Sequence, residues 1–111
     1  MRLLSLSLLL LPSIASAATN SVTNASKSEA RVTVKYATNL CKNDFLTLKP
    51  GEAKTYQAGL CCALEVSAVK TNVKDAAAAK LTVPKTACRS AKWVVKDGAA
   101  GASPALTITG S

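Results

Sequence analysis

The sequence contains no histidine, one tryptophan, one phenylalanine and two tyrosines, and this scarcity limits the chemistry available to the chain. Without histidine there is no Ser-His-Asp triad, no Cys-His pair and no histidine ligand for a metal ion. Few aromatic side chains also disfavour binding of single-stranded nucleic acid, which relies on bases stacking on exposed rings. We therefore expect a protein that is not an enzyme and that uses neither a metal ion nor a cofactor.

Acidic residues are also few, because six carboxylates stand against 14 lysines and arginines. Glycoside hydrolysis needs two facing carboxylates, and a phosphate-binding loop needs a glycine-rich turn that opens a helix. Neither pattern is recognisable, so a hydrolase is the least favoured interpretation. The carboxylates fall mostly in turn-like segments, where they favour turns and solubility, and they are Glu29, Asp44, Glu52, Glu65, Asp75 and Asp97.

Long apolar runs are lacking, and the one notable run opens the chain. Arg2 precedes an apolar stretch over residues 3–11, Pro12 ends it, and Ala15-Ser16-Ala17 is a small-residue cleavage box. These are the parts of a secretory signal peptide, and the stretch is shorter than the ~20 residues that span a bilayer. We predict that residues 1–17 are a signal peptide and that residues 18–111 form one secreted, extracellular domain without a transmembrane segment.

Four cysteines lie in the predicted secreted part: Cys41, Cys61, Cys62 and Cys88. An even number of cysteines in a short exported chain predicts disulfides, here two. Zinc is disfavoured because the spacings do not match known zinc sites and the adjacent Cys61 and Cys62 do not easily point at one ion.

The pairing of the cysteines depends on a predicted hairpin. The segment 49–52, Lys-Pro-Gly-Glu, is a strong turn signal. A hairpin closed by it would place Phe45 opposite Tyr56, a favourable aromatic pair, and Cys41 next to Cys61. Because successive strand residues point to opposite faces, Cys61 and Cys62 should take different partners. We favour Cys41–Cys61 with Cys62–Cys88; the exchange of Cys61 and Cys62 is the close alternative, and a vicinal bond is the least favoured.

Alternating apolar and polar residues predict short strands separated by turns about every ten residues. The fold class that fits is all-β: a small antiparallel β-sandwich of about seven strands, immunoglobulin-like in the loose sense, with two disulfides. Greek-key and jelly-roll topologies fit as well. The segments with strand character are 18–22, 30–37, 45–48, 53–58, 64–71, 81–83, 91–96 and 105–109.

Three local expectations follow from these patterns. Trp93 has the inward parity of its strand and should be buried. Leu64 should share the inward face with Val66, because the two are separated by one residue. The alanine-rich segment 74–80 should form either one helical turn or a crossover loop, since it is too short for a stable helix.

Basic residues are spread along the chain, and removal of Arg2 with the signal peptide lowers the formal net charge from +8 to +7. Alternation places Arg31 and Lys35 together on one outer face, and Lys92 and Lys96 together on an outer face. If the two strands are neighbours, these four residues form one basic face. An anionic cell-surface glycan, a lipid head group or a host protein would then be a natural partner, and nucleic acid is disfavoured.

Asn24-Ala25-Ser26 is a sequon for N-glycosylation, so Asn24 is a candidate glycosylation site, with an unused triplet as the alternative. The exclusion of catalysis, export and positive charge together favour a secreted, non-catalytic interaction protein that acts through a basic β-sandwich surface, such as an effector, a toxin-like protein or a cell-surface-binding module. The alternative is a structural subunit of an extracellular filament or surface layer, which the many small and β-branched residues also suit.

Overall fold

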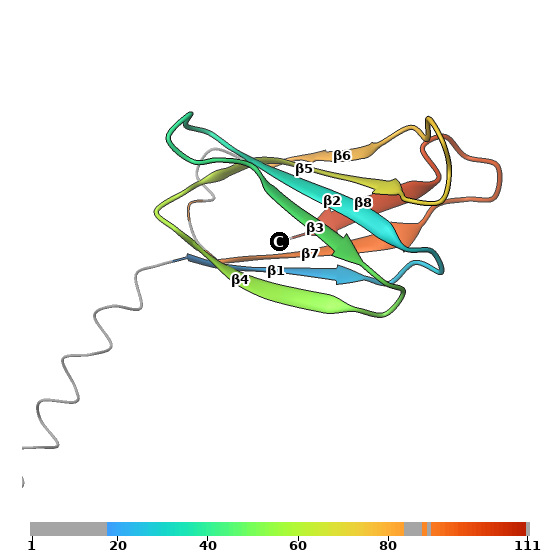
Figure 1. Ribbon diagram of the computed structural model, residues 1–111, viewed down its shortest axis with the longest axis horizontal. Coiled ribbons are helices and arrows are strands. Elements are labelled where there is room, and N and C mark those ends of the chain that lie inside the picture. Colours follow the sequence, from blue (N-terminus) through green and yellow to red (C-terminus); the bar gives the residue numbers. More distant parts are fainter. Residues whose placement is uncertain (1–17, 84–87, 89, 111) are drawn as a thin grey trace, which may run out of the picture.

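The computed structural model describes residues 18–83, 88 and 90–110; the predicted signal peptide, residues 1–17, lies outside the described residues. The regular elements of this part of the chain are eight strands (Figure 1). In chain order they are β1 (Ala18–Asn24), β2 (Ala30–Tyr36), β3 (Asp44–Leu48), β4 (Ala53–Gly59), β5 (Ala63–Lys70), β6 (Ala79–Thr82), β7 (Ala91–Asp97) and β8 (Leu106–Gly110).

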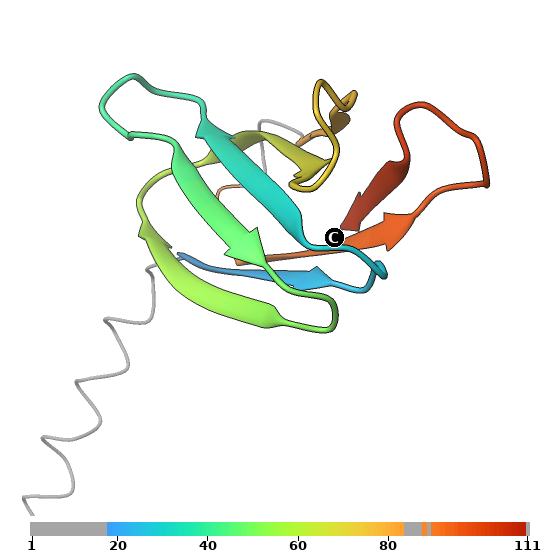
Figure 2. The ribbon, with the colours of Figure 1, turned by 45° about the vertical axis from the view of Figure 1, so that its right-hand side comes forward.

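The strands form two four-stranded sheets, with the orders β4-β1-β7-β8 and β3-β2-β5-β6. The sheets lie over one another as the two layers of a sandwich (Figure 2). All pairings are antiparallel except that of β1 with β7, in which Val22 lies beside Trp93. The predicted all-β sandwich with two disulfides is confirmed, with eight strands rather than about seven.

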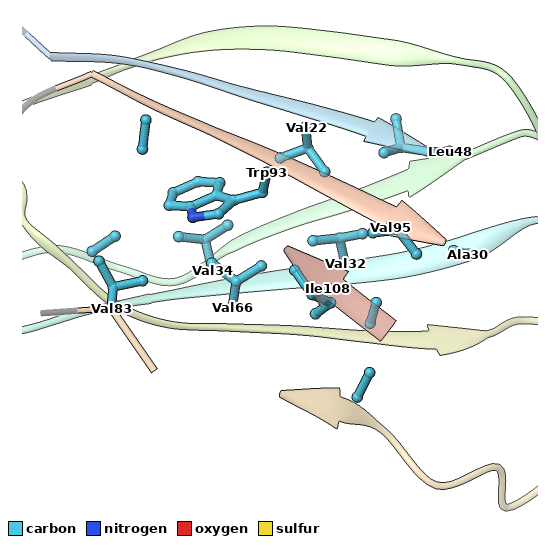
Figure 3. Close-up of a cluster of buried hydrophobic side chains, with 14 of the residues drawn as sticks. Val22, Ala30, Val32, Val34, Leu48, Val66, Val83, Trp93, Val95 and Ile108 are labelled. Atoms are coloured by element: carbon cyan, nitrogen blue, oxygen red, sulfur yellow. The ribbon is translucent and has the colours of Figure 1, made fainter. Parts of the chain in front are cut away.

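The core lies between the sheets and is built from small and β-branched side chains. In β2 the residues alternate strictly, with Val32 and Val34 fully buried and Arg31 and Lys35 exposed. Because of this alternation, a strand in which about half of the residues are polar can still bury one apolar face. Trp93 is the largest core residue and is only 2% exposed, which confirms its predicted burial. Figure 3 shows its indole facing the valines of the opposite sheet.

Gly110 makes room for the tryptophan. It lies directly opposite Trp93 in the β7–β8 pair. A Cβ atom built on Gly110 would collide with the indole ring and come within 2.9 Å of the Lys92 carbonyl oxygen. The indole is rigid and packed in the core, so any larger residue at this position forces β8 away from β7.

The predicted hairpin between β3 and β4 is wrong. The turn itself forms, with the Glu52 backbone N–H donating to the Lys49 carbonyl at 2.9 Å. However, β3 pairs with β2 and β4 pairs with β1, so the turn joins the two sheets. Phe45 is consequently 68% exposed on an outer face, whereas Tyr56 is half-buried. Turn chemistry reverses the chain direction but does not decide which strands share hydrogen bonds.

Two further local expectations are resolved by the structure. Lys35 pairs with Glu65 but Tyr36 pairs with Ala63, so Leu64 is the extra residue of a β-bulge. Its side chain is 37% exposed, and the expectation that it faces the core with Val66 is wrong. Between β5 and β6 the chain forms turns over residues 71–75 and irregular backbone over residues 76–78, so the alanine-rich segment forms no helix. Because β5 and β6 pair antiparallel, the segment belongs to a hairpin loop, and the crossover-loop alternative is wrong as well.

Candidate binding surfaces

The predicted basic face does not exist as one surface. Arg31 and Lys35 extend from β2, whereas Lys92 and Lys96 extend from β7, and these strands belong to different sheets. All four side chains are exposed, so they point outward from opposite sides of the sandwich. The parity of each strand was read correctly, but the assumption that the strands are neighbours is wrong.

The outer face of the β3-β2-β5-β6 sheet mixes positive charge with one aromatic ring. Across the four strands, Phe45 lies beside Thr33, Thr33 beside Ser67, and Ser67 beside Lys80. Lys35 forms an ion pair with Glu65, with 3.8 Å between Nζ and Oε1, so its charge is partly compensated.

The outer face of the β4-β1-β7-β8 sheet is rich in hydroxyl groups. A hollow opens there over three strands, and two of its lining residues are joined by a hydrogen bond of 3.0 Å from the backbone N–H of Thr19 to Ser90 Oγ. Among the described residues of its lining, Lys92 is the one that carries a charge. The hollow can therefore donate and accept hydrogen bonds beside a positive charge, and its described lining consists of Thr19, Ser21, Thr55, Ser90, Ala91 and Lys92.

Most carboxylates accept a hydrogen bond or form an ion pair within the protein. Asp44 accepts a hydrogen bond from the Tyr36 hydroxyl, and Glu65 pairs with Lys35. Three other carboxylates accept hydrogen bonds in loops. The Thr71 hydroxyl donates to Glu29 Oε1 at 2.7 Å. The backbone N–H of Lys49 donates to Glu52 Oε1, and that of Lys27 donates to Asp97 Oδ2, both at 2.9 Å. Among the described residues the Lys35–Glu65 contact is the only ion pair, so the positive charge of the surface is largely uncompensated.

A polar cluster that the sequence analysis did not predict lies at one end of the core. The hydroxyl oxygens of Tyr36 and Tyr56 are 3.3 Å apart, and Tyr36 also donates to Asp44. Burial raises the pKa of the Tyr36 hydroxyl far above its usual range, and the bonds with Asp44 and Tyr56 act in the same direction. Burial also raises the pKa of Tyr56, although hydrogen bonds with Tyr36 and Asn20 oppose that increase. Both hydroxyls therefore stay neutral and serve as structural links.

Both disulfides lie at this same end. Cys41 is bonded to Cys61 and Cys62 to Cys88, with Cα–Cα distances of 6.0 and 4.3 Å. This is the pairing that the sequence analysis favoured, although the hairpin from which it was argued does not form. The β2–β3 loop (residues 37–43), the β4–β5 turn (residues 59–62) and Cys88 are together called the disulfide end.

The disulfide end displays apolar side chains that the sequence analysis missed. Leu40 and Leu60 are 93% and 89% exposed, and each directly precedes a bonded cysteine. Phe45 and Leu64 lie just beyond, at the starts of β3 and β5. Of the five large exposed hydrophobic residues in the described chain, only Val73 lies elsewhere. A repeated Leu-Cys pair at residues 40–41 and 60–61 is the sequence signal that could have identified this surface.

Asn24 organises the opposite end. It is fully buried, and its Nδ2 donates to the carbonyls of Ser28 and Leu48 at 2.8 and 2.9 Å. Its Oδ1 accepts from both the backbone N–H and the hydroxyl of Ser26. A glycan on Nδ2 would displace these bonds, so the folded structure favours the unused-triplet alternative for this sequon. The turns at residues 25–29 and 49–52, with the start of the loop at Thr71, are called the Asn24 end.

The described residues contain neither a metal site nor a membrane-spanning helix. No group of three or more histidine, cysteine, aspartate or glutamate side chains there is arranged to hold a metal ion. No helix in that part of the chain has the length and apolar character needed to cross a membrane.

Comparison with known proteins identifies the fold alone. No protein family matches the sequence, and no curated protein is similar to it in sequence. Among solved structures, the NMR structure of a protein from Eubacterium rectale superposes with a TM-score of 0.58 at 9% identity. The match covers 85% of this chain and 87% of the other, so nearly the whole sandwich is shared. At this identity the likeness concerns the arrangement of strands and says nothing about a partner.

Proposed function

We propose that this is a secreted, non-catalytic binding protein that attaches to anionic surfaces outside the cell. The observation that carries the proposal is that most carboxylates have a partner within the chain, whereas most of the described lysines do not. Five of the six carboxylates are engaged by loops, by Tyr36 or by Lys35, while most lysines are exposed without a partner among the described residues. The lysines therefore remain available to an anionic target, whereas most carboxylates already have a partner within the chain.

Export is part of the same proposal. The predicted signal peptide directs the chain out of the cytoplasm, and two disulfides are compatible with an oxidising compartment. Disulfides also suit a domain of this size, whose hydrophobic core is small.

Salt-dependent binding is the direct test. The protein without residues 1–17 is mixed with a soluble sulfated polysaccharide, with vesicles containing an anionic lipid, and with neutral phosphatidylcholine vesicles. We expect binding to the anionic targets at low salt and its loss at about 1 M salt, where the screening length falls to about 3 Å. Absence of binding to every anionic target at low salt would contradict the proposal.

A matched pair of charge reversals locates the contact. Lys92→Glu with Lys96→Glu alters one outer face, and Arg31→Glu with Lys80→Glu alters the other, by the same change in net charge. We expect the first pair to weaken polysaccharide binding more, because Lys92 lies in the hydroxyl-lined hollow. A larger effect from the second pair would assign binding to the opposite sheet.

One observation favours a structural subunit as a second candidate. β3 is an edge strand of its sheet and carries the exposed Phe45, and the strand contains no lysine or proline of the kind that protects edges from pairing. A filament subunit would polymerise through such an edge. Sedimentation of the purified protein separates the two candidates, since a monomer that resists association over a wide concentration range is expected only of the binding protein.

A further inference from the structure

We infer that the disulfide end is a membrane-contacting tip, which inserts Leu40 and Leu60 into the interface of an anionic lipid bilayer. The inference rests on the proposed binding of anionic surfaces. It specifies an anionic lipid bilayer as the target and the disulfide end as the part of the protein that contacts it. It is carried by the geometry of two turns that present the leucines from different parts of the chain.

The two turns share one hydrogen-bond pattern. In the first, the Cys41 backbone N–H donates to the Thr38 carbonyl at 3.1 Å, and in the second the Cys61 N–H donates to the Ala58 carbonyl at 3.0 Å. Each turn therefore spans four residues and ends on a cysteine, with a leucine in the position before it. Gly59 has a φ of 61°, a conformation in which other residues are strained, and this allows the tight second turn.

The turns are joined to each other. The Cys41–Cys61 disulfide connects their last residues, and the Ala37 backbone N–H donates to the Cys62 carbonyl at 2.9 Å. Both segments lie at one end of the sandwich in Figures 1 and 2. The two turns that carry the leucines are thus cross-linked to each other, and inserting the leucines requires little additional ordering of the chain.

The exposure of these leucines has no explanation within the monomer. A leucine that is about nine-tenths exposed gains nothing from folding, and single turns at a loop tip normally carry polar residues. Two of them in equivalent positions, with Phe45 and Leu64 behind them, give the tip an apolar surface that a bilayer interface would bury.

The charge around the tip selects an anionic lipid. Lys42 is exposed directly beside Cys41, and it is the only charged residue in segments 37–43 and 59–62. The nearest carboxylate in sequence, Asp44, is held by the Tyr36 hydroxyl. An apolar tip flanked by a lysine and by no free carboxylate of those segments matches the combination of apolar burial and attraction that anchors peripheral proteins.

The test uses a double variant that carries both Leu40→Ser and Leu60→Ser. This variant is compared with the control Val73→Ser. Val73 is 47% exposed in the loop between β5 and β6, at the other end of the sandwich, and neither variant changes the net charge. We expect the double variant to partition into anionic vesicles about ten-fold or more weakly than the parent, since leucine burial drives insertion. The control and the binding of soluble sulfated polysaccharide should stay within about two-fold.

The outcomes separate this inference from the proposed function. If the parent binds polysaccharide but no vesicles, or if the double variant partitions like the parent, the membrane tip is wrong and the proposed function stands. If the parent binds no anionic target, the proposed function fails as well. A concentration-dependent dimer that the double variant abolishes would also overturn the inference, because the leucines would then cover a second copy of the chain.

Insertion can be observed directly with a Leu60→Trp variant. Trp93 is buried and provides a constant background. We expect the new fluorescence to shift to shorter wavelength on anionic vesicles and to be quenched by brominated lipid chains. Unchanged emission from a bound protein would overturn the inference. Circular dichroism and the absence of free thiols in every variant confirm that the fold and both disulfides are intact.

Discussion

The two ends of this sandwich order their loops by different means. At the Asn24 end, one buried amide joins Ser26, Ser28 and Leu48, and the bond between Glu29 and Thr71 ties down the next loop. At the disulfide end, covalent bonds hold the loops. A hydrogen-bonded end must turn its polar side chains inward and keep its sequence polar. A cross-linked end needs only its cysteines, so the neighbouring positions are free to expose apolar side chains.

The largest change should come from the residue that lies between the ends. Trp93→Ala removes the largest core side chain and leaves a cavity between the sheets, so we expect a loss of about 3–5 kcal/mol in unfolding free energy. Denaturant unfolding followed by far-UV circular dichroism measures it. Hydrogen exchange should increase at both ends together. A loss under about 1 kcal/mol would mean that the sheets close over the gap.

Removal of one cross-link should affect the ends unequally. Replacing Cys41 and Cys61 together by alanine opens a loop with a sequence separation of 20 residues, and we expect a loss of about 3 kcal/mol. Hydrogen exchange should rise at residues 37–43 and remain unchanged at residues 25–29. Equal increases at both ends would show that the disulfide stabilises the whole domain and not its own end.

The converse change is Asn24→Ala, which leaves the carbonyls of Ser28 and Leu48 without their amide donor. We expect a loss of about 1–3 kcal/mol, because buried groups lose their partners. The control is Asn39→Ala, an exposed asparagine of the disulfide end, with an expected change within about 0.5 kcal/mol. Equal effects of the two changes would remove the distinction drawn between the ends.

The smallest expected effect is a change in the pH dependence of stability. It arises from the hydrogen-bonded cluster of Tyr36, Tyr56 and Asp44 near the disulfide end. The pKa of Tyr36 is raised in the folded protein, so above its ordinary value of 10.0 the unfolded chain releases a proton that the folded chain retains. The contribution of Tyr36 to stability is therefore complete below about pH 10 and declines above it. Denaturant unfolding at increasing alkaline pH should show a shallower decline for Tyr36→Phe, and an identical decline would contradict this role.

The parts predictable from sequence are those that depend on neighbours along one strand. Alternation identified the buried face of β2 and the inward position of Trp93, because side-chain direction in a strand repeats every two residues. It failed at Leu64, where one inserted residue shifts the register and leaves a leucine outside.

The parts that were not predictable depend on which strands become neighbours. Nothing local in Arg31 or Lys92 indicates that their strands lie in different sheets, and the same lack of information produced the incorrect β3–β4 hairpin. The cysteine pairing survived that error because both segments reach the same end of the sandwich in either arrangement. The exposed Leu40 escaped notice because leucine is ordinarily assigned to a core.

The position of β1 sets the order in which the domain can be completed. This strand leads the described chain, yet it lies inside its sheet, between β4 and β7. It meets β7 only when the segment around Trp93 arrives, about 70 residues after Val22. During synthesis β2, β3 and β5 can pair with one another early, because they are close in sequence. The edge of β1 that pairs with β7 has no partner strand until the last quarter of the chain has been made. The two sheets therefore cannot be completed before the segment around Trp93 has been synthesised.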